Sequence, residues 1–321
     1  MKRVLITGGA GFIGSNLVNS LNKQNEYQIE VVDNLSNGHL AFLPDNLDKD
    51  SLMISNFDSD GVIDRVKSGC YDYIVHLAAN PRVLYTVEHP YETHQTNVTA
   101  TMRLLDASRG NIKRFIFAST SAIYGNNSTL PSRPDAGDDP RSPYALQKLF
   151  IERYLKLFYN LYGLDSVSLR FFNVFGPNQL GNSPYSTAVS AWIDAIMKGR
   201  KMRSDGDGSQ TRDMCHVDNI VSAIKLSLLH KDDLCGNVYN VGCNESVSNK
   251  EILSYLLKKF PHSSYYDAPW RAGDIMHTLA DIDKTKNELG YHVSVPFWEG
   301  LDKTIEWNQK NSSLIERLEI D

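Results

Sequence analysis

The chain has 321 residues, of which 41% are hydrophobic and 22% charged, a composition that excludes wholesale disorder and allows about two domains. The formal net charge of −5, with no Lys/Arg run longer than two, argues against a nucleic-acid partner, which needs clustered positive charge. Four cysteines make no disulfide framework, and no apolar run approaches the roughly 18 residues that span a bilayer. We therefore expect a cytoplasmic globular protein with no membrane contact and no metal.

Short apolar runs alternate with amphipathic stretches over the first 170 residues. Runs rich in Val, Ile and Phe predict strands at 4–7, 29–33, 73–77, 115–119 and 166–170. Helical periodicity between them predicts helices at 12–23, 60–67, 94–107 and 143–162. Such alternation indicates βαβ units, so we expect an α/β fold with a doubly wound parallel sheet of the Rossmann type.

Beyond residue 170 the alternation is lost, and glycine and proline become denser. Periodicity there predicts a strand at 237–241 and helices at 186–198, 217–229, 248–259 and 297–309. We therefore expect a first domain at 1–170 and a smaller α/β region at 171–321. Segments can cross between the two.

Three glycines, Gly8, Gly11 and Gly14, lie between the first predicted strand and the first predicted helix. The first allows a tight turn, the second lets the backbone approach a pyrophosphate, and the third lets the helix pack closely on the strand. Asp33 follows about 20 residues later, at the end of the second strand. Its carboxylate can bind both ribose hydroxyls and repels a 2′-phosphate, so the sequence predicts NAD rather than NADP.

A candidate catalytic pair opens the helix at 143–162. Ser142 is a good N-cap, Pro143 suits the first helical position, and Tyr144 and Lys148 lie one turn apart on one face. A free tyrosine has a pKa near ~10, and a lysine cation and the positive helix end would both lower that pKa. The pair therefore predicts a tyrosine that shuttles a proton, although a solvated Tyr and Lys can have the same spacing by chance.

Hydroxyl side chains at 119–121 come after the fifth predicted strand. Because the carboxyl ends of parallel strands border the ligand crevice, a hydroxyl there can hydrogen-bond a substrate oxygen. Taken alone, the segment is equally typical of an ordinary polar loop.

Together these residues resemble the extended short-chain dehydrogenase/reductase family. The matching segments are 7–14, 33–36, 76–79, Asn97, 119–125 and the pair Tyr144 and Lys148. Residues 170–177, 211–213, 271–274 and the tail from Gly300 to Trp307 look like the family's parts that hold a nucleoside diphosphate sugar. The resemblance covers nearly the whole chain, with the cofactor in the first domain and mainly the sugar nucleotide in the second.

The resemblance implies a role for individual residues. Ser121 and Tyr144 would flank the reacting sugar hydroxyl, and Lys148 would bind the nicotinamide ribose. The implied NAD site comprises Gly8, Gly11, Phe12, Ile13, Gly14, Asp33, Asn34, Asn56, Phe57, Leu77, Ala78, Ala79, Asn97, Tyr144 and Lys148. The implied substrate site comprises Arg82, Thr86, Ser121, Tyr144, Asn173, Arg212, Arg271, Asp274 and Thr278.

One contact within this set stays open. Family members usually carry an Asp that binds the adenine amino group, where this chain has Asn56. The Asn56 carbonyl can accept the same hydrogen bond, and Asp58 is a neighbouring alternative.

The two residues after Thr120 indicate the branch of the family. Sugar 4,6-dehydratases carry an Asp-Glu pair there, whereas this chain has Ser121 and Ala122. The form at 121–125 resembles nucleotide-sugar 4-epimerases, in which the tyrosine takes the 4-hydroxyl proton as the C4 hydride moves to NAD. The 4-ketose then turns over and receives the hydride on its other face. The resemblance also implies a homodimer that pairs the helices at 94–107 and 143–162.

The expected substrate is a UDP-hexose. Thr278 stands where some UDP-galactose 4-epimerases carry a bulky Tyr, and a smaller residue leaves room beside the C2 substituent. This favours UDP-GlcNAc and UDP-GalNAc, with UDP-Glc and UDP-Gal also accepted. A UDP-glucuronate 4-epimerase or decarboxylase is an alternative that needs a cation such as Arg82 for the carboxylate. A catalytically dead NAD-sensing regulator is the alternative outside the enzymes.

Overall fold

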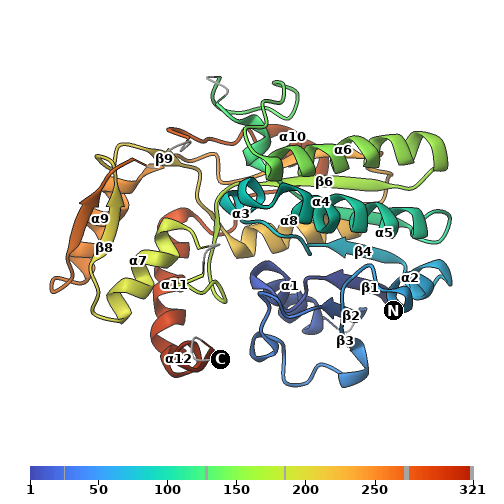
Figure 1. Ribbon diagram of the computed structural model, residues 1–321, viewed down its shortest axis with the longest axis horizontal. Helices are drawn as coiled ribbons and strands as arrows, with labels where there is room; N and C mark the ends of the chain where they lie inside the picture. The colour runs from blue at the N-terminus through green and yellow to red at the C-terminus, as the bar shows by residue number, and fades with distance from the viewer. Residues whose placement is uncertain (25, 127–128, 184–185, 271–274, 319–321) are drawn as a thin grey trace.

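A seven-stranded parallel sheet forms the centre of the computed structural model, which describes residues 1–24, 26–126, 129–183, 186–270 and 275–318 (Figure 1). The strands run in the order β11-β6-β5-β4-β1-β2-β3, and every neighbouring pair is parallel. Their bounds are β1 Lys2–Thr7, β2 Tyr27–Asp33, β3 Leu52–Ile54, β4 Tyr73–His76, β5 Arg114–Thr120, β6 Ser166–Phe171 and β11 Asn237–Val241. The strand order reverses between β1 and β4, so a crevice opens at the carboxyl ends of these two strands.

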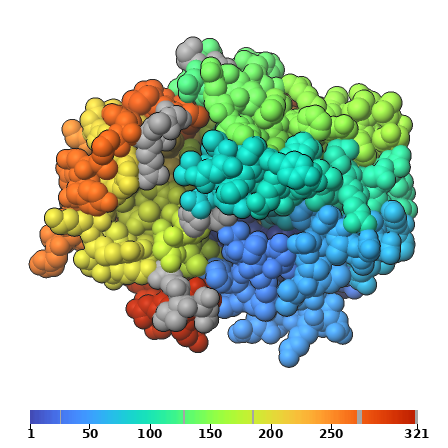
Figure 2. All heavy atoms as spheres, in the orientation of Figure 1, coloured from blue at the N-terminus to red at the C-terminus, as the bar shows by residue number. Residues whose placement is uncertain are grey.

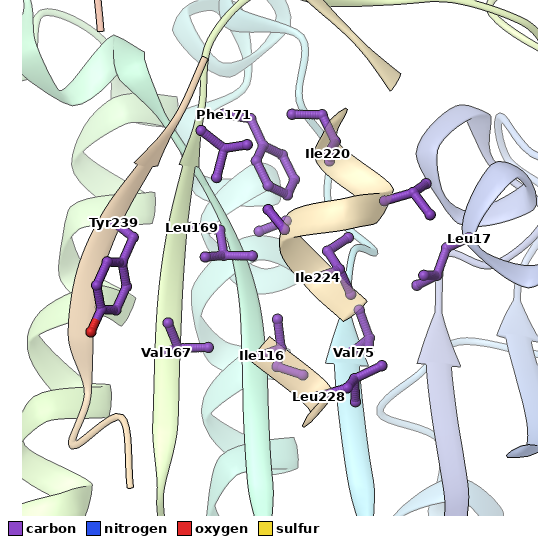
Figure 3. Close-up of a cluster of buried hydrophobic side chains, with 14 of the residues drawn as sticks. Leu17, Val75, Ile116, Val167, Leu169, Phe171, Ile220, Ile224, Leu228 and Tyr239 are labelled. Atoms are coloured by element: carbon purple, nitrogen blue, oxygen red, sulfur yellow. The ribbon is translucent and has the colours of Figure 1, made fainter. Parts of the chain in front are cut away.

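Helices cover both faces of this sheet, as the alternation of side chains along each strand requires. On one face Val4, Ile6 and Val75 pack under α1 (Phe12–Asn22) and α8 (Val217–Leu229), a cluster drawn in Figure 3. On the other face Leu5 and Ile74 lie under a second set of elements. These are α2 (Asp60–Lys67), α5 (Thr101–Ala107), α6 (Pro143–Tyr162) and the π-helical turn η3 (Gln95–Ala100). The predicted doubly wound fold is confirmed.

A smaller lobe lies beside the carboxyl ends of the strands, on the left in Figures 1 and 2. Its core joins α7 (Ala188–Met197), α9 (Asn249–Lys259) and α11 (Phe297–Lys310). Three short strand pairs complete it: β7 (Val174–Phe175) with β10 (Cys215–His216), β8 (Met202–Asp205) with β13 (Tyr265–Ala268), and β9 (Thr211–Arg212) with β12 (Val247–Ser248). The chain crosses back between the parts, because β11 is a strand of the main sheet and α8 packs against that sheet.

Several shorter elements border the crevice or the edges. The helices α3 (Val83–Glu88) and α4 (Pro90–His94) follow β4, and η4 (Ser121–Tyr124) follows β5. The helices α10 (Asp283–Leu289) and α12 (Ser312–Leu318) lie late in the chain, and η1 (Leu40–Phe42) and η2 (Lys49–Ser51) are single turns. Within the described ranges, no helix has the length and apolar character needed to cross a membrane.

Candidate active site

The glycine-rich loop begins where β1 ends and is held against β4. Gly8 has φ +70°, which favours glycine, and an added Cβ there would lie 2.8 Å from the backbone nitrogen of Ala78. A Cβ on Gly14 would lie 2.1 Å from the Gly8 carbonyl oxygen. Both positions therefore need glycine, because backbone approaches backbone at each of them.

This loop delivers the N-terminus of α1 to the crevice. Gly11 is the N-cap and has no side-chain cap, and the first turn, with Phe12 and Ile13 half-buried, carries no acidic residue. The first N–H groups of a helix lack intrahelical partners and attract anions. An uncapped helix end beside glycines therefore fits the pyrophosphate of a dinucleotide.

Asp33 ends β2 beside this loop and is buried. Its Oδ2 accepts a hydrogen bond from the Ala10 N–H (3.0 Å), and its Oδ1 accepts one from the Leu35 N–H (2.8 Å). One carboxylate thus fixes the glycine loop and the turn after β2. Each oxygen keeps a further lone pair, which suits ribose hydroxyls at this edge of the sheet.

Part of the hydrogen-bonding capacity of the predicted adenine site is used by bonds within the chain. The exposed Asn34 donates from Nδ2 to Oδ1 of the exposed Asn56 (2.9 Å), so the carbonyl proposed for adenine already accepts one bond. The Phe57 ring is buried and meets His76 edge-on at 4.8 Å between centroids. The Phe57 side chain therefore belongs to the core, which leaves its backbone to face a cofactor.

The segment after β4 closes the floor of the crevice. The Leu77 N–H donates to the Thr7 carbonyl (3.1 Å), the Ala78 N–H donates to the Thr7 hydroxyl (3.3 Å), and Ala79 is half-buried. Asn97 is buried, and its Oδ1 accepts from the Asn80 N–H (2.7 Å).

The side-chain amide of Asn97 uses both of its N–H groups within the chain. They donate to the Asn80 carbonyl (3.0 Å) and to Gln147 Oε1 on α6 (2.8 Å). Asn97 therefore ties the segment after β4 to α6, and the cofactor contact that the resemblance implied stays a prediction.

The start of α6 places Tyr144 at the mouth of the crevice. Ser142 caps the helix, its hydroxyl accepting from the Ala145 N–H (3.2 Å), and Pro143 follows as predicted. The Tyr144 N–H donates to the hydroxyl of Thr86 on α3 (3.2 Å). That hydroxyl is fully buried and itself donates to the Val83 carbonyl (2.6 Å). Thr86 is therefore enclosed and supports Tyr144, and its predicted contact with substrate stays a prediction.

The Tyr144 hydroxyl meets a hydroxyl that was not among the predicted site residues. The side chains of Tyr144 and Thr120 share a hydrogen bond, and Thr120 Oγ1 also accepts from the Ala122 N–H (3.1 Å). Thr120 ends β5, and the run of hydroxyls at 119–121 was the available signal. Ser121, the predicted partner, is half-buried at the start of η4, and its role stays a prediction.

Lys148 is buried one turn after Tyr144. Its Nζ donates to the Ala118 carbonyl (2.7 Å) and lies 5.9 Å from the centroid of the Tyr144 ring. Burial lowers the pKa of Lys148 to about 7, and the nearby Glu152 carboxylate opposes this by raising it. Lys148 thus changes charge close to neutral pH.

The ionisation of Tyr144 differs from the expectation. Burial raises the pKa of Tyr144 to about 12. The hydrogen bond with Thr120 lowers this pKa, but by less than burial raises it. The prediction of a lowered pKa is therefore wrong for the chain by itself. Desolvation of the phenolate outweighs the lysine, whose ammonium group points at the Ala118 carbonyl.

The predicted sugar-nucleotide residues gather where the small lobe meets the crevice. Asn173, between β6 and β7, donates from Nδ2 to Thr278 Oγ1 (3.2 Å) and to the Asp213 carbonyl (3.4 Å). The Asp213 N–H donates to the same threonine hydroxyl (3.1 Å). The structure therefore brings together Asn173 and Thr278, which lie about a hundred residues apart in the chain.

Asp213 is the hub of this arrangement, although it was not predicted as a site residue. Its buried carboxylate accepts from the N–H groups of Cys243 (2.7 Å), Asn244 (3.0 Å) and Ala280 (3.0 Å). Burial raises the pKa of Asp213 to about 6, although the three N–H groups act in the opposite direction. This one side chain thus joins its own segment to two others, at 243–244 and at Ala280.

The predicted arginines have different settings. Arg212 donates from Nη1 to the carbonyls of Thr211 (3.0 Å) and Met276 (3.1 Å), which sets it against the segment before Thr278. Arg82 is half-buried at the N-cap of α3. Arg271 and Asp274 lie outside the described residues.

The sequence of the chain is similar to a known family and to individual proteins with names. A model of the NAD dependent epimerase/dehydratase family matches residues 4–242. A putative UDP-glucose 4-epimerase of Methanocaldococcus jannaschii is 31% identical, with 96% of this chain and 99% of that protein covered. A UDP-N-acetyl-alpha-D-glucosaminuronate decarboxylase of Bacillus cytotoxicus is 32% identical, with 95% and 97% covered.

Two solved structures have the same fold over nearly the whole chain. The UDP-N-acetylglucosamine 4-epimerase of Methanobrevibacter ruminantium has a TM-score of 0.88 and 34% identity, with 97% of this chain and 99% of that chain covered. The UDP-glucose 4-epimerase of Thermotoga maritima, solved with UDP-glucose, has a TM-score of 0.90 and 33% identity, with the same shares covered. The sugars named for these two enzymes differ at C2, and the uronate named for the Bacillus cytotoxicus relative is also oxidised at C6.

Proposed function

The chain belongs to the NAD-dependent epimerase/dehydratase family, and on that basis we propose that it inverts C4 of a UDP-hexose, with UDP-GlcNAc and UDP-GalNAc as its preferred pair. The observation that carries the proposal is the group at the crevice: Tyr144 hydrogen-bonded to Thr120, with Lys148 one turn away. The positions after Thr120 hold Ser121 and Ala122, so the acid pair of the dehydratases is missing there.

The residues around the crevice fit NAD. The uncapped N-terminus of α1 and the glycine loop would hold the pyrophosphate, Asp33 the adenosine ribose, and Lys148 the nicotinamide ribose. When bound, NAD supplies a hydride acceptor and donor for C4 of the sugar. The protein's own part is to orient the sugar and to move one proton.

That proton belongs to the 4-hydroxyl of the sugar. Tyr144, as the phenolate, would accept this proton. It would later return the proton to the oxygen on C4 of the sugar with the opposite configuration. Thr120 and the protonated form of Lys148 favour the phenolate through a hydrogen bond and a positive charge. Because Tyr144 is anchored through its N–H to Thr86, its hydroxyl stays in place while the 4-keto sugar turns over.

Support for an N-acetylhexosamine comes from Thr278. Its side chain is small and is held back by hydrogen bonds from Asn173 and from the Asp213 N–H. A side chain of this size leaves room for an acetamido group, although removing a clash permits a substrate without requiring it. The UDP-N-acetylglucosamine 4-epimerase among the similar structures agrees with this preference.

The test is an assay of the purified protein with UDP-Glc, UDP-GlcNAc and UDP-GlcA separately, with chromatographic separation of the products. We expect conversion of UDP-GlcNAc to UDP-GalNAc. Good turnover of UDP-Glc with none of UDP-GlcNAc would contradict the preferred substrate, and turnover of UDP-GlcA alone would favour the uronate reactions. Tyr144→Phe should lower turnover about 10²–10⁴-fold with NAD still bound, whereas Tyr162→Phe, at the end of the same helix, should not.

We further propose that the protein is a homodimer. Large apolar side chains on adjacent helices are exposed: Val83, Leu84, Val87 and Tyr91 on α3 and α4, and Leu146, Phe150, Leu157 and Leu161 on α6. These helices form the front of the molecule, teal and green in Figure 2. An apolar surface of this extent favours a partner, and a second copy would cover it symmetrically. The exposed residues favour α3 and α4 beside α6, rather than the whole stretch 94–107.

A further inference from the structure

Glu152 is a buried carboxylate that the proton transfer described above does not use. It lies on α6 one turn after Lys148, with 3% of its surface exposed. Residues four apart on a helix are neighbours on one face. The side chains of Tyr144, Lys148 and Glu152 therefore form one column along the catalytic helix.

Two strands hold this carboxylate from below. Its Oε1 accepts from the Ser119 hydroxyl on β5 (2.5 Å) and from Arg170 Nε on β6 (3.0 Å), and its Oε2 accepts from Arg170 Nη2 (2.7 Å). Burying an ion is costly unless it is paired and fully hydrogen-bonded. β5 and β6 thus fix the geometry of Glu152, which forms an ion pair with Arg170.

Arg170 is itself positioned from the far side of Glu152. Its Nη2 also donates to Asp138 Oδ1 (2.9 Å), and its guanidinium lies 4.7 Å from the centroid of the Tyr124 ring. Asp138 in turn pairs with Arg153 at the surface. Of the charges in this cluster, the carboxylate of Glu152 is the one that raises the pKa of Lys148.

Lys148 and Glu152 bind two consecutive residues near the end of β5. Lys148 donates to the Ala118 carbonyl, and the next residue, Ser119, donates to Glu152. The residue after that is Thr120, which contacts Tyr144. The end of β5, which carries the Thr120 hydroxyl, is therefore held by hydrogen bonds to both Lys148 and Glu152 of α6.

Other ionisable groups nearby do not take over this role. His76 on β4 is fully buried between the Thr7 and Thr101 hydroxyls, and burial lowers its pKa to about 3, so it is neutral. The Phe117 ring, 4.6 Å from Lys148 Nζ, carries no charge. Further charges border the cavity of about 850 Å³ beyond Glu152, and these are Arg133, Asp135, Lys156, Asp281, Asp283 and Lys284.

We propose that Glu152 is a positioning residue: held by Arg170 and Ser119, it keeps Lys148 protonated and bound to the Ala118 carbonyl beside Tyr144. A lysine buried among apolar groups loses its charge unless an anion lies close, and Glu152 is the carboxylate one turn away. Burial brings the pKa of Lys148 to about 7, so a modest change at Glu152 decides its charge at neutral pH. The importance of this charge for turnover rests on the proposed function.

The decisive experiment measures Lys148 directly. Protein labelled with 13C at the lysine ε-carbon is titrated by NMR, and the signal of Lys148 is identified by its absence from Lys148→Met. Glu152→Gln should move the titration midpoint of Lys148 to lower pH by about one unit, because it removes the negative charge that raises the pKa of Lys148. Glu152→Asp should restore part of the shift. Glu30→Gln, which removes a carboxylate from another Glu–Arg pair, should leave the Lys148 midpoint unchanged.

A second variant covers the possibility that Glu152→Gln does not fold. Glu152→Gln/Arg170→Gln removes both charges, and the Lys148 midpoint should still fall because Glu152 is the charged group that raises the Lys148 pKa. An unchanged midpoint in either folded variant overturns the proposal. A lowered midpoint in a protein that turns over none of the three UDP-sugars would uphold it and reject the proposed function, so the two failures are distinguishable.

Discussion

The hydroxyl of Tyr144 has two neighbouring candidates for its partner, Thr120 and Ser121, at the end of β5. The structure joins Tyr144 to Thr120 by a hydrogen bond that lowers the pKa of the phenol. Without that bond the phenolate is less stable, so Thr120→Val should reduce turnover by about tenfold to hundredfold. It should also move the acidic limb of the pH–rate profile to higher pH, because the pKa of the base rises.

Ser121→Ala is the matched comparison, since it removes a hydroxyl one residue away. We expect a smaller loss of turnover from it than from Thr120→Val. Both variants should retain NAD, which absorbance of the purified protein reports. A larger loss from Ser121→Ala would show that Ser121, as the resemblance implied, is the main partner of the reacting hydroxyl.

At the scale of elements, the N-terminus of α1 depends on close contact between backbones. An added Cβ on Gly14 would lie 2.1 Å from the Gly8 carbonyl, so Gly14→Ala must push the helix away from the loop. We expect NAD to be lost and the melting temperature to fall, as measured by cofactor content and calorimetry.

Gly61 provides a control at the same point of another helix, the first turn of α2. A Cβ there meets no atom within 4 Å, and alanine favours helix. Gly61→Ala should therefore stabilise the protein by about 0.5–1 kcal/mol and leave NAD binding unchanged. If both variants kept NAD equally well, the glycine loop would not be the pyrophosphate site.

For the whole molecule, the exposed apolar side chains of α3, α4 and α6 should be the dimer contact. Leu157→Glu/Leu161→Glu places two carboxylates on the α6 part of this surface. The exposed fraction of Leu157 is 46% and that of Leu161 is 61%. Burying unpaired charges at an interface is unfavourable, so light scattering should give half the mass of the unmodified protein. Leu229→Glu on α8, also exposed, should not change the mass. An unmodified protein that is already monomeric would contradict the proposal.

Regular elements could be predicted from the sequence where local patterning is strong. The helix at 143–162 and the strand at 237–241 have the predicted bounds. Local periodicity marks both elements, and a Ser-Pro start also marks the helix. The edge strand β3 and the helix α3 were not predicted, since three and six residues are too few to show a period. The predicted helix at 94–107 begins earlier, as α4, and continues through the π-helical turn η3, whose extra residue per turn leaves no mark in the sequence.

Spacing along the chain was enough to predict where the candidate site residues lie on the elements: a glycine loop after a strand, an acid at the end of the next strand, and Tyr144 and Lys148 on one helix face. The geometry of a helix or strand converts such spacing directly into position. Folding in three dimensions established that Thr120 contacts Tyr144, that Thr86 is enclosed, that Asp213 joins three segments, and that burial controls the charges of Tyr144 and Lys148. Contacts and desolvation depend on which distant segments pack together, and a single chain's spacing does not record that.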